Sequence, residues 1–171
     1  MVRESTRAPV GTGRADPAAT FERVYAAQFA PLVRLAYVTT GSLPEAEDVV
    51  QDVFASVHHR FGEIDTPVAY LRRAVLSRCT SWVRRRRLER RHAATTAGYP
   101  DGAAMPLGPE ATVVRAALVR LNPRQRAAVF LRYYLDLPEI EIAAALACRP
   151  GTVKSLLSRA LAVLREHLDE D

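Results

Sequence analysis

Short polar and cationic side chains follow Pro150 at helical spacing, close to the C-terminus. Proline suits the first turn of a helix, because its missing N–H would have no partner there. Hydroxyl and cationic groups near the N-terminus of a helix can hydrogen-bond phosphates and base edges in the major groove of DNA. The candidate DNA contacts are Thr152, Lys154, Ser155, Ser158 and Arg159.

Two helices joined by a tight turn have to position these side chains. The second helix carries apolar residues three and four apart over 153–164, which places one side in a core. A helix-turn-helix of this kind enters DNA, although similar helix pairs also occur in bundles that bind no DNA. Acidic residues outnumber basic ones in this segment, so the predicted DNA contact is local and weak. The apolar positions of the short first helix are Ile140, Ile142, Ala143 and Leu146.

Residues 42–59 have a clear amphipathic pattern. Ser42 and Glu45 fit a capping box, in which each side chain accepts a hydrogen bond from the other residue's backbone N–H. Apolar residues then recur every three or four positions over 46–57. Acidic and amide side chains gather on the opposite side, so we expect one core face and one acidic face.

An arginine-rich helix is predicted to start at Thr66-Pro67 and to run to about residue 91, after a loop over 60–65. Its inward stripe includes Cys79 and Trp82, while its last turns carry many arginines that only Glu89 opposes. Such a charge density repels itself in water, which favours nearby phosphates. A solvated helix end is the alternative. Calmodulin-like or membrane-surface binding fits less well, because the core needs the opposite stripe.

The rest of the sequence predicts an all-α fold of two small helical domains joined by a flexible linker. A helix over 17–40 is expected to kink or split at Pro31 and to end at Gly41. Asn122 and Pro123 look like the cap and first turn of another helix, which follows one over about 110–120. The predicted parts are a disordered arm at 1–16, a domain at 17–92, a linker at 93–109 and a second domain at 110–168.

Composition excludes several classes of protein. The 171-residue chain is 49% hydrophobic and carries a formal charge of +5, which suits a folded protein with a polyanionic partner. It has no apolar run of about 18 residues that could span a membrane and no secretory signal, so we expect a cytoplasmic protein without membrane binding. Cys79 and Cys148 are expected to be buried, reduced thiols. No metal-ligand spacing, catalytic triad or phosphate loop is evident, so no cofactor, metal site or enzyme activity is expected.

Three features occur in order: an acid-faced helix, an arginine-rich helix after a short loop, and a helix-turn-helix beyond a linker. Together they resemble the bacterial sigma factors of the extracytoplasmic-function type within the sigma-70 family, and an actinobacterial SigE-like group in particular. The resemblance covers nearly everything from Phe21 to Leu168. Its most specific strings are PEAEDVVQDVF, AYLRRAVLSRCTSWVRRRR, LNPRQRAAVFLRYYLDL and EIAAALACRPGTVKSLLSRA.

The resemblance implies core RNA polymerase and promoter DNA as partners. In that family the acid-faced helix docks on the coiled coil of the largest clamp subunit, a role that maps onto Glu47, Asp48, Gln51 and Asp52. The loop and the helix after it bind a flipped base and the backbone near the −10 element. The corresponding residues are Arg60, Asp65, Thr66, Arg73, Ser77, Arg84, Arg85, Arg86 and Arg87, and Ser77 stands where the family commonly has asparagine.

By the same resemblance, the second helix of the C-terminal pair would read the −35 element. The family's contacts carry over as Arg149, Thr152, Lys154, Ser155, Ser158 and Arg159, and Leu156 replaces an arginine often seen there. Most relatives of this kind are held inactive by an anti-sigma factor, which the sequence does not identify. Two alternatives stay open from the sequence. One is a helix-turn-helix regulator that acts as a dimer without core polymerase. The other is an adaptor whose first domain only contacts protein.

Overall fold

The structure is a computed structural model that describes residues 17–92 and 116–168. Every regular element in these two stretches is helical, which confirms the all-α fold class. The predicted arm at 1–16 and linker at 93–109, and the predicted helix start near 110, lie outside the described residues. None of the described helices is both long and apolar enough to cross a membrane.

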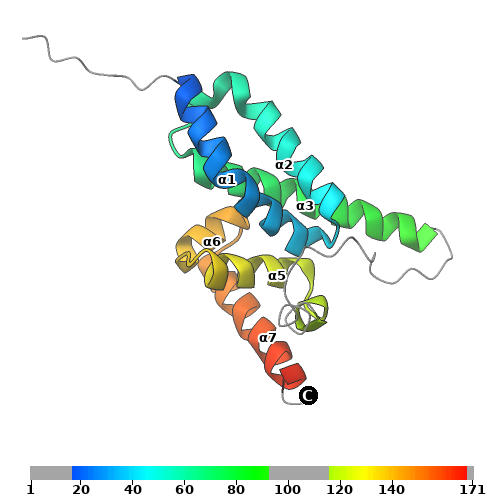
Figure 1. Ribbon diagram of the computed structural model, residues 1–171. Helices are drawn as coiled ribbons and strands as arrows, with labels where there is room; N and C mark the ends of the chain where they lie inside the picture. The colour runs from blue at the N-terminus through cyan, green and yellow to red at the C-terminus, as the bar shows by residue number, and fades with distance from the viewer. Residues whose placement is uncertain (1–16, 93–115, 169–171) are drawn as a thin grey trace, which may run out of the picture.

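Three helices form the N-terminal group: α1 (Pro17–Thr40), α2 (Leu43–Val57) and α3 (Pro67–His92) (Figure 1). α1 continues through Pro31 as one element, so the expected split does not occur. Gly41 ends α1 as predicted. Its φ of 77° is the left-handed conformation that glycine adopts without strain, and its N–H donates to the Tyr37 carbonyl at 2.7 Å.

The start of α2 corrects the predicted capping box. Ser42 occupies the N-cap position with an extended backbone, but its side chain makes no capping hydrogen bond. The backbone N–H of Ser42 donates to the Thr40 hydroxyl at 3.3 Å instead, which is the donor that Glu45 was expected to accept from. Thr40 therefore takes the place of Glu45 as the acceptor, and the Ser42 carbonyl accepts from the Ala46 N–H at 3.0 Å as the helix starts.

The predicted loop over 60–65 is largely a 3₁₀ helix, η1 (His58–Glu63). Phe61 is buried, and its ring lies edge-on to Phe21 of α1 with centroids 5.1 Å apart. This aromatic contact holds the segment against the body and explains why it is ordered in helical form. Only a short link separates it from Pro67, which begins α3 as predicted.

The C-terminal group contains α5 (Pro123–Val129), the π-helical turn η2 (Phe130–Tyr134), α6 (Glu139–Ala145) and α7 (Pro150–Leu168), and residues 116–119 are also helical. Asn122 caps α5 as predicted. Its side chain accepts from the Gln125 N–H at 2.9 Å, and the Gln125 side chain accepts from the Asn122 N–H at 3.0 Å. This pair forms a complete capping box.

The apolar stripe of α6 differs from the prediction at one position. Ile142 and Ala143 are buried as expected, but Ile140 is 66% exposed.

The two cysteines differ in burial. Cys79 is buried in α3, where burial raises the pKa of its thiol to about 12. Cys148 was predicted to be buried but is only half-buried. These differences depend on what packs against each helix, which local spacing does not reveal.

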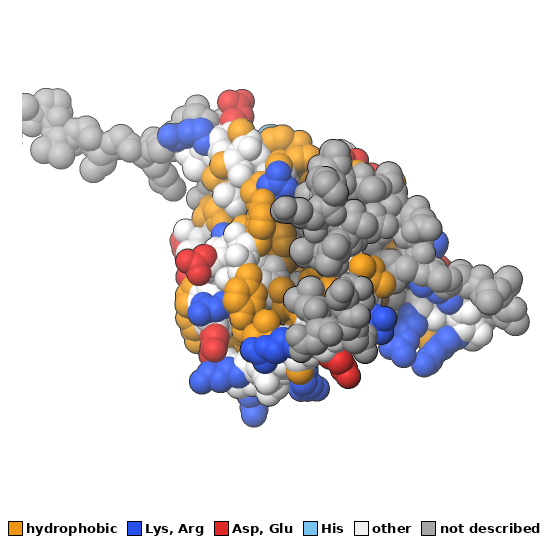
Figure 2. All heavy atoms as spheres, turned by 60° about the horizontal axis from the view of Figure 1, so that its bottom comes forward, with side chains coloured by type: hydrophobic (Ala, Val, Ile, Leu, Met, Phe, Trp, Pro, Cys, Tyr) orange, Lys and Arg blue, Asp and Glu red, His pale blue; other side chains and the backbone are white. Residues whose placement is uncertain are grey.

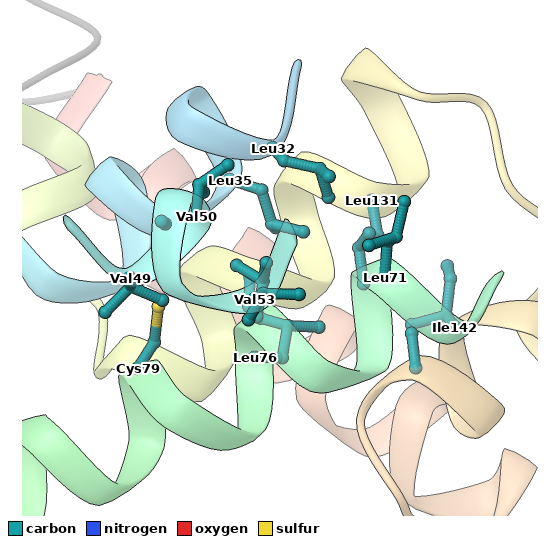
Figure 3. Close-up of a cluster of buried hydrophobic side chains, with 14 of the residues drawn as sticks. Leu32, Leu35, Val49, Val50, Val53, Leu71, Leu76, Cys79, Leu131 and Ile142 are labelled. Atoms are coloured by element: carbon teal, nitrogen blue, oxygen red, sulfur yellow. The ribbon is translucent and has the colours of Figure 1, made fainter. Parts of the chain in front are cut away.

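The two helical groups share one hydrophobic core. α1 packs against α5 and η2, and α3 packs against α5 and α6. Leu71 of α3 lies near Leu131 of η2 and Ile142 of α6 in the same buried cluster as Leu32 and Val53 (Figure 3). Within the described part of the chain, the groups therefore form one packed body.

Candidate nucleic-acid interface

The predicted DNA-contacting residues of the helix-turn-helix share one exposed side of α7 and the turn before it. Val153, Leu157 and Ala160 are buried on the other side and fix the rotation of the helix. In the turn, the Cys148 N–H donates to the Ala143 carbonyl at 2.9 Å, which sets the angle between α6 and α7. The structure places Arg149, Thr152, Lys154, Ser155, Ser158 and Arg159 in the solvent.

Four of these residues line a shallow, open hollow of about 410 Å³: Lys154, Ser155, Ser158 and Arg159. The Ser155 hydroxyl donates to the Gly151 carbonyl at 3.0 Å, and Arg159 Nε donates to the Ser155 carbonyl at 3.1 Å. These bonds hold the side chains along the helix. Lys154 Nζ lies 3.9 Å from a carboxylate oxygen of Glu139, so an acidic side chain of α6 faces the lysine.

The beginning of α7 is open to close approach. A Cβ added to Gly151 would meet no atom within 4 Å. The helix dipole favours a phosphate at this end of α7, although the N–H groups of Thr152 and Val153 already donate to the Arg149 carbonyl. The surface can therefore hold a nucleic-acid backbone at one end and present polar side chains to base edges along its length.

A second cationic surface lies on α3. Arg73 and Ser77 are exposed four residues apart, and the run Arg84, Arg85, Arg86 and Arg87 is exposed near the end of the helix. The last turns of α3 project beyond α1 and α2 (Figure 1), and Figure 2 shows Lys and Arg side chains there and, separately, over the C-terminal group. The Arg86 guanidinium lies 5.8 Å from the centre of the Trp82 ring.

The segment before α3 brings Arg60, Asp65 and Thr66 to the surface. The guanidinium of Arg60 lies over the Tyr70 ring, 5.5 Å from its centre, and donates to the Tyr70 hydroxyl. The sequence interpretation did not include Tyr70. Its position four residues after Thr66, on the side of α3 that faces the loop, is the signal that could have identified it.

The acidic surface lies on α2 and adjoins α3 at Asp52. Glu47, Asp48, Gln51 and Asp52 are all exposed, as predicted. Asp52 accepts a hydrogen bond from Arg78 of α3 at 3.1 Å, a contact that sequence spacing within α2 could not reveal. Because both side chains are largely exposed, this ion pair orients Asp52 more than it stabilises the fold.

The predicted residues thus lie on three exposed surfaces, one on α2, one on α3 with the segment before it, and one on α7 with the turn before it. Within 17–92 and 116–168, no group of three or more His, Cys, Asp and Glu residues could hold a metal ion. Exposed polar surfaces without converging catalytic groups suit recognition of large partners.

Comparison with known proteins agrees with this arrangement. Residues 25–89 match the family model for sigma-70 region 2, and residues 112–164 match the model for sigma-70 region 4. The chain is 36% identical over 127 residues to the RNA polymerase sigma-E factor of Streptomyces coelicolor, with 72% of each chain covered. It is 32% identical over 151 residues to the ECF RNA polymerase sigma factor SigM of Mycobacterium tuberculosis, covering 84% of this chain and 74% of that one.

The chain belongs to the extracytoplasmic-function sigma factors.

The fold of this sigma factor also occurs in solved structures. It superposes with a TM-score of 0.76 on the sigma factor RpoE of Bartonella quintana, crystallised with the anti-sigma factor NepR, covering 89% of this chain and 98% of that one at 24% identity. The TM-score with CnrH, in complex with the cytosolic domain of CnrY, is 0.65, with 90% of each chain covered at 24% identity. The matches to both regions confirm the interpretation as a sigma factor in transcription initiation and favour it over a regulator with a helix-turn-helix alone.

Proposed function

We propose that this sigma factor directs core RNA polymerase to promoters through three surfaces. Glu47, Asp48, Gln51 and Asp52 on α2 bind core polymerase, α3 and the segment before it bind the −10 element, and α7 binds the −35 element. The observation that carries the proposal is the exposed polar side of α7 and of the turn before it, where every predicted −35 contact is exposed. The protein has no catalysis of its own and works in the cytoplasm.

The acidic surface of α2 suits a basic helix of the polymerase. Charges at such an interface speed and orient association more than they add affinity. The Arg78 contact holds Asp52 in place before the partner arrives. The buried apolar residues of α2 lie on its other side, so the acidic side chains do not contribute to the core.

The −10 surface combines a backbone-binding part with a base-binding part. Arg84, Arg85, Arg86 and Arg87 supply positive charge to phosphates, a contribution that weakens as salt rises. Arg60, Asp65 and Thr66 lie in the segment before α3, and Arg73 and Ser77 lie along its first three turns, where an unstacked base is expected to bind. Unstacking a base costs a few kcal/mol, which its binding site has to return.

The −35 surface uses the hydroxyl and cationic groups of α7. Lys154 and Arg159 are the cationic side chains among the −35 candidates within α7 and are the strongest candidates for base-edge contacts. Arg149 and Thr152 stand near the helix N-terminus, where the helix dipole favours phosphates. Residues 17–92 and 110–168 act as region 2 and region 4, and 93–109 is the linker between them.

An anti-sigma factor is a further partner in this proposal. One solved structure of similar fold is the sigma factor RpoE in complex with the anti-sigma factor NepR, and another is CnrH in complex with the cytosolic domain of CnrY. The chemistry of such a partner here follows from the surfaces it has to block, which are basic on α3 and mixed on α7.

The test is transcription reconstituted from core polymerase, the purified chain and a fragmented genomic library. We expect start sites that share two upstream motifs and appear only when both proteins are present. Binding of duplex promoter DNA by the chain alone at moderate salt, with no change when core polymerase is added, would support the polymerase-independent regulator instead.

A further inference from the structure

An acidic side chain of α6 adjoins the −35 surface of α7. α6 and α7 pack against each other (Figure 1), and Glu139 is the first residue of α6. One of its carboxylate oxygens lies 3.9 Å from Nζ of Lys154, and the two side chains are 38% and 71% exposed. Both are therefore accessible to a partner of the helix-turn-helix, although sequence spacing pointed only to the lysine.

The start of α6 determines where its acidic residues face. Pro138 has an extended backbone at the N-cap position, and its carbonyl accepts from the N–H groups of Glu141 at 3.0 Å and Ile142 at 3.1 Å. The first turn of α6 contains two acidic residues, which the helix dipole favours. They have different neighbours, because Glu141 lies 3.8 Å from Arg72 of α3 whereas Glu139 faces α7. Position in the first turn alone does not explain this difference.

The ion pair between Glu139 and Lys154 affects DNA binding more than it affects stability. An exposed pair of this length adds little to the free energy of unfolding. A DNA phosphate, however, attracts the lysine and repels the carboxylate. Because the pair has no net charge, a phosphate beside it gains little.

A guanine base edge does not meet the same repulsion. The lysine ammonium group has three N–H donors, so two remain when one points toward Glu139. Guanine presents two neutral acceptors in the major groove, N7 and O6, which match a lysine. Lys154 also lines the open hollow on the polar side of α7, where a base edge can approach. The pair can therefore bind guanine without bringing a negative charge next to the carboxylate.

We propose that Glu139 is a specificity-determining residue of the −35 surface, which directs Lys154 to a guanine and weakens its attraction to phosphate. Glu139 acts through Lys154 and is thus a positioning residue. Specificity is the difference between the affinities for correct and incorrect partners, so a group that lowers affinity for DNA of any sequence raises it. This inference rests on the proposed function of α7.

Glu139→Gln tests the inference, because the amide retains the shape of the side chain and removes its charge. The full chain bound to core polymerase is titrated with promoter duplexes recovered in the genomic reconstitution, either unchanged or with each G·C pair of the −35 element replaced by A·T. At low salt we expect Glu139→Gln to raise the affinity for the substituted duplex about fivefold, the worth of one charge pair 4 Å apart in water. Discrimination between the duplexes should fall, and the slope of log affinity against log salt should steepen by about one.

Glu141→Gln is the matched control. It makes the same charge change in the same turn of α6, but Glu141 adjoins Arg72 of α3, so discrimination and salt slope should stay unchanged. Circular dichroism of both glutamine variants should match that of the parent, since both glutamates are exposed.

Two further measurements test whether the effect passes through Lys154. In a Lys154→Gln background, Glu139→Gln should no longer lower the discrimination. Replacing single guanines of the −35 element by 7-deazaguanine, which lacks the N7 acceptor, should weaken binding of the parent at one position and leave Lys154→Gln unaffected there.

The outcomes separate this inference from the proposed function. If the parent discriminates between the duplexes and Glu139→Gln changes neither discrimination nor salt slope, the inference is wrong and the proposed function stands. An equal effect of Glu139→Gln with and without Lys154, or a −35 motif without a G·C pair, would overturn it as well. A parent that binds both duplexes alike would overturn the proposed role of α7 together with this inference.

Discussion

Region 2 and region 4 differ in how much of their structure each supports alone. α1, α2 and α3 have 24, 15 and 26 residues, whereas α5 and α6 have seven residues each. Helices shorter than about 12–15 residues are marginal in water unless tertiary contacts hold them. Region 4 gains such contacts from α1 and α3. Its short helices therefore depend on region 2 more than the long helices of region 2 depend on region 4.

The largest expected effect is at the shared core. Leu131→Ala removes a fully buried side chain between the regions and should cost about 2–5 kcal/mol of unfolding free energy. Chemical denaturation followed by circular dichroism measures this cost, and Tyr133→Ala, at a 61% exposed position of the same turn, is the control that should change little. Because the regions share a core, we expect one transition. Two unfolding transitions, with that of region 2 unaffected by Leu131→Ala, would show that the regions unfold independently and would contradict this dependence.

The next largest effect is expected on promoter recognition by α7 of region 4. Lys154→Ala and Arg159→Ala should each lower promoter-directed transcription. The loss of binding free energy to the −35 element should be about 1–3 kcal/mol if the side chain contacts a base edge, and less if it contacts phosphate. Ala162→Ser changes an exposed position one turn further along α7 and serves as the control. Equal transcription from matched templates and templates mutated in the −35 element would remove the assignment of α7.

Two variants at helix N-caps, one in each region, should differ by about 1 kcal/mol in the unfolding free energy that they lose. Asn122→Ala deletes the capping bond to Gln125 and should destabilise the protein by about 0.5–2 kcal/mol. Ser42→Ala should have almost no effect, because the Ser42 hydroxyl makes no capping bond. Thermal unfolding of both variants checks the contrast, and an equal loss in both would show that Ser42 does cap α2.

The smallest effect on the fold is expected from the acidic surface of region 2. Asp48→Ala with Asp52→Ala should weaken binding to core polymerase while the unfolding free energy changes little, since both side chains are exposed. Glu22→Ala, at an exposed position of α1, controls for charge loss away from α2. Titration of labelled protein with core polymerase gives the affinities, and unchanged affinity in the double variant would count against docking through α2.

Features set by local spacing were predictable from the sequence. Proline and cap residues located the starts of α3, α5 and α7, and the periodicity of apolar residues separated the acidic face of α2 from its core. The exposed residues of α7 follow from the same argument, because the buried positions of a helix determine which side remains open.

Features set by distant partners were not predictable in the same way. Arg126 looks in sequence like an ordinary surface charge of a short helix, and only the end of α1 explains its burial. Ile140 fits an apolar stripe by spacing, yet no neighbour covers it enough to bury it. Ser42 satisfies a capping pattern that Thr40 makes unnecessary. Each outcome depends on which neighbouring group contacts the residue, and sequence spacing alone does not show this.

The π-helical turn of η2 accommodates one residue more than a regular turn, with the Leu135 N–H donating to the Phe130 carbonyl at 3.2 Å. Deleting one residue from 130–134 would restore ordinary winding and rotate the following side chains by about 100° around the axis. Tyr134, whose hydroxyl accepts a hydrogen bond from Arg34 of α1 at 2.6 Å, would then turn away from it. The length of this single turn therefore sets the angular register by which one half of the molecule meets the other.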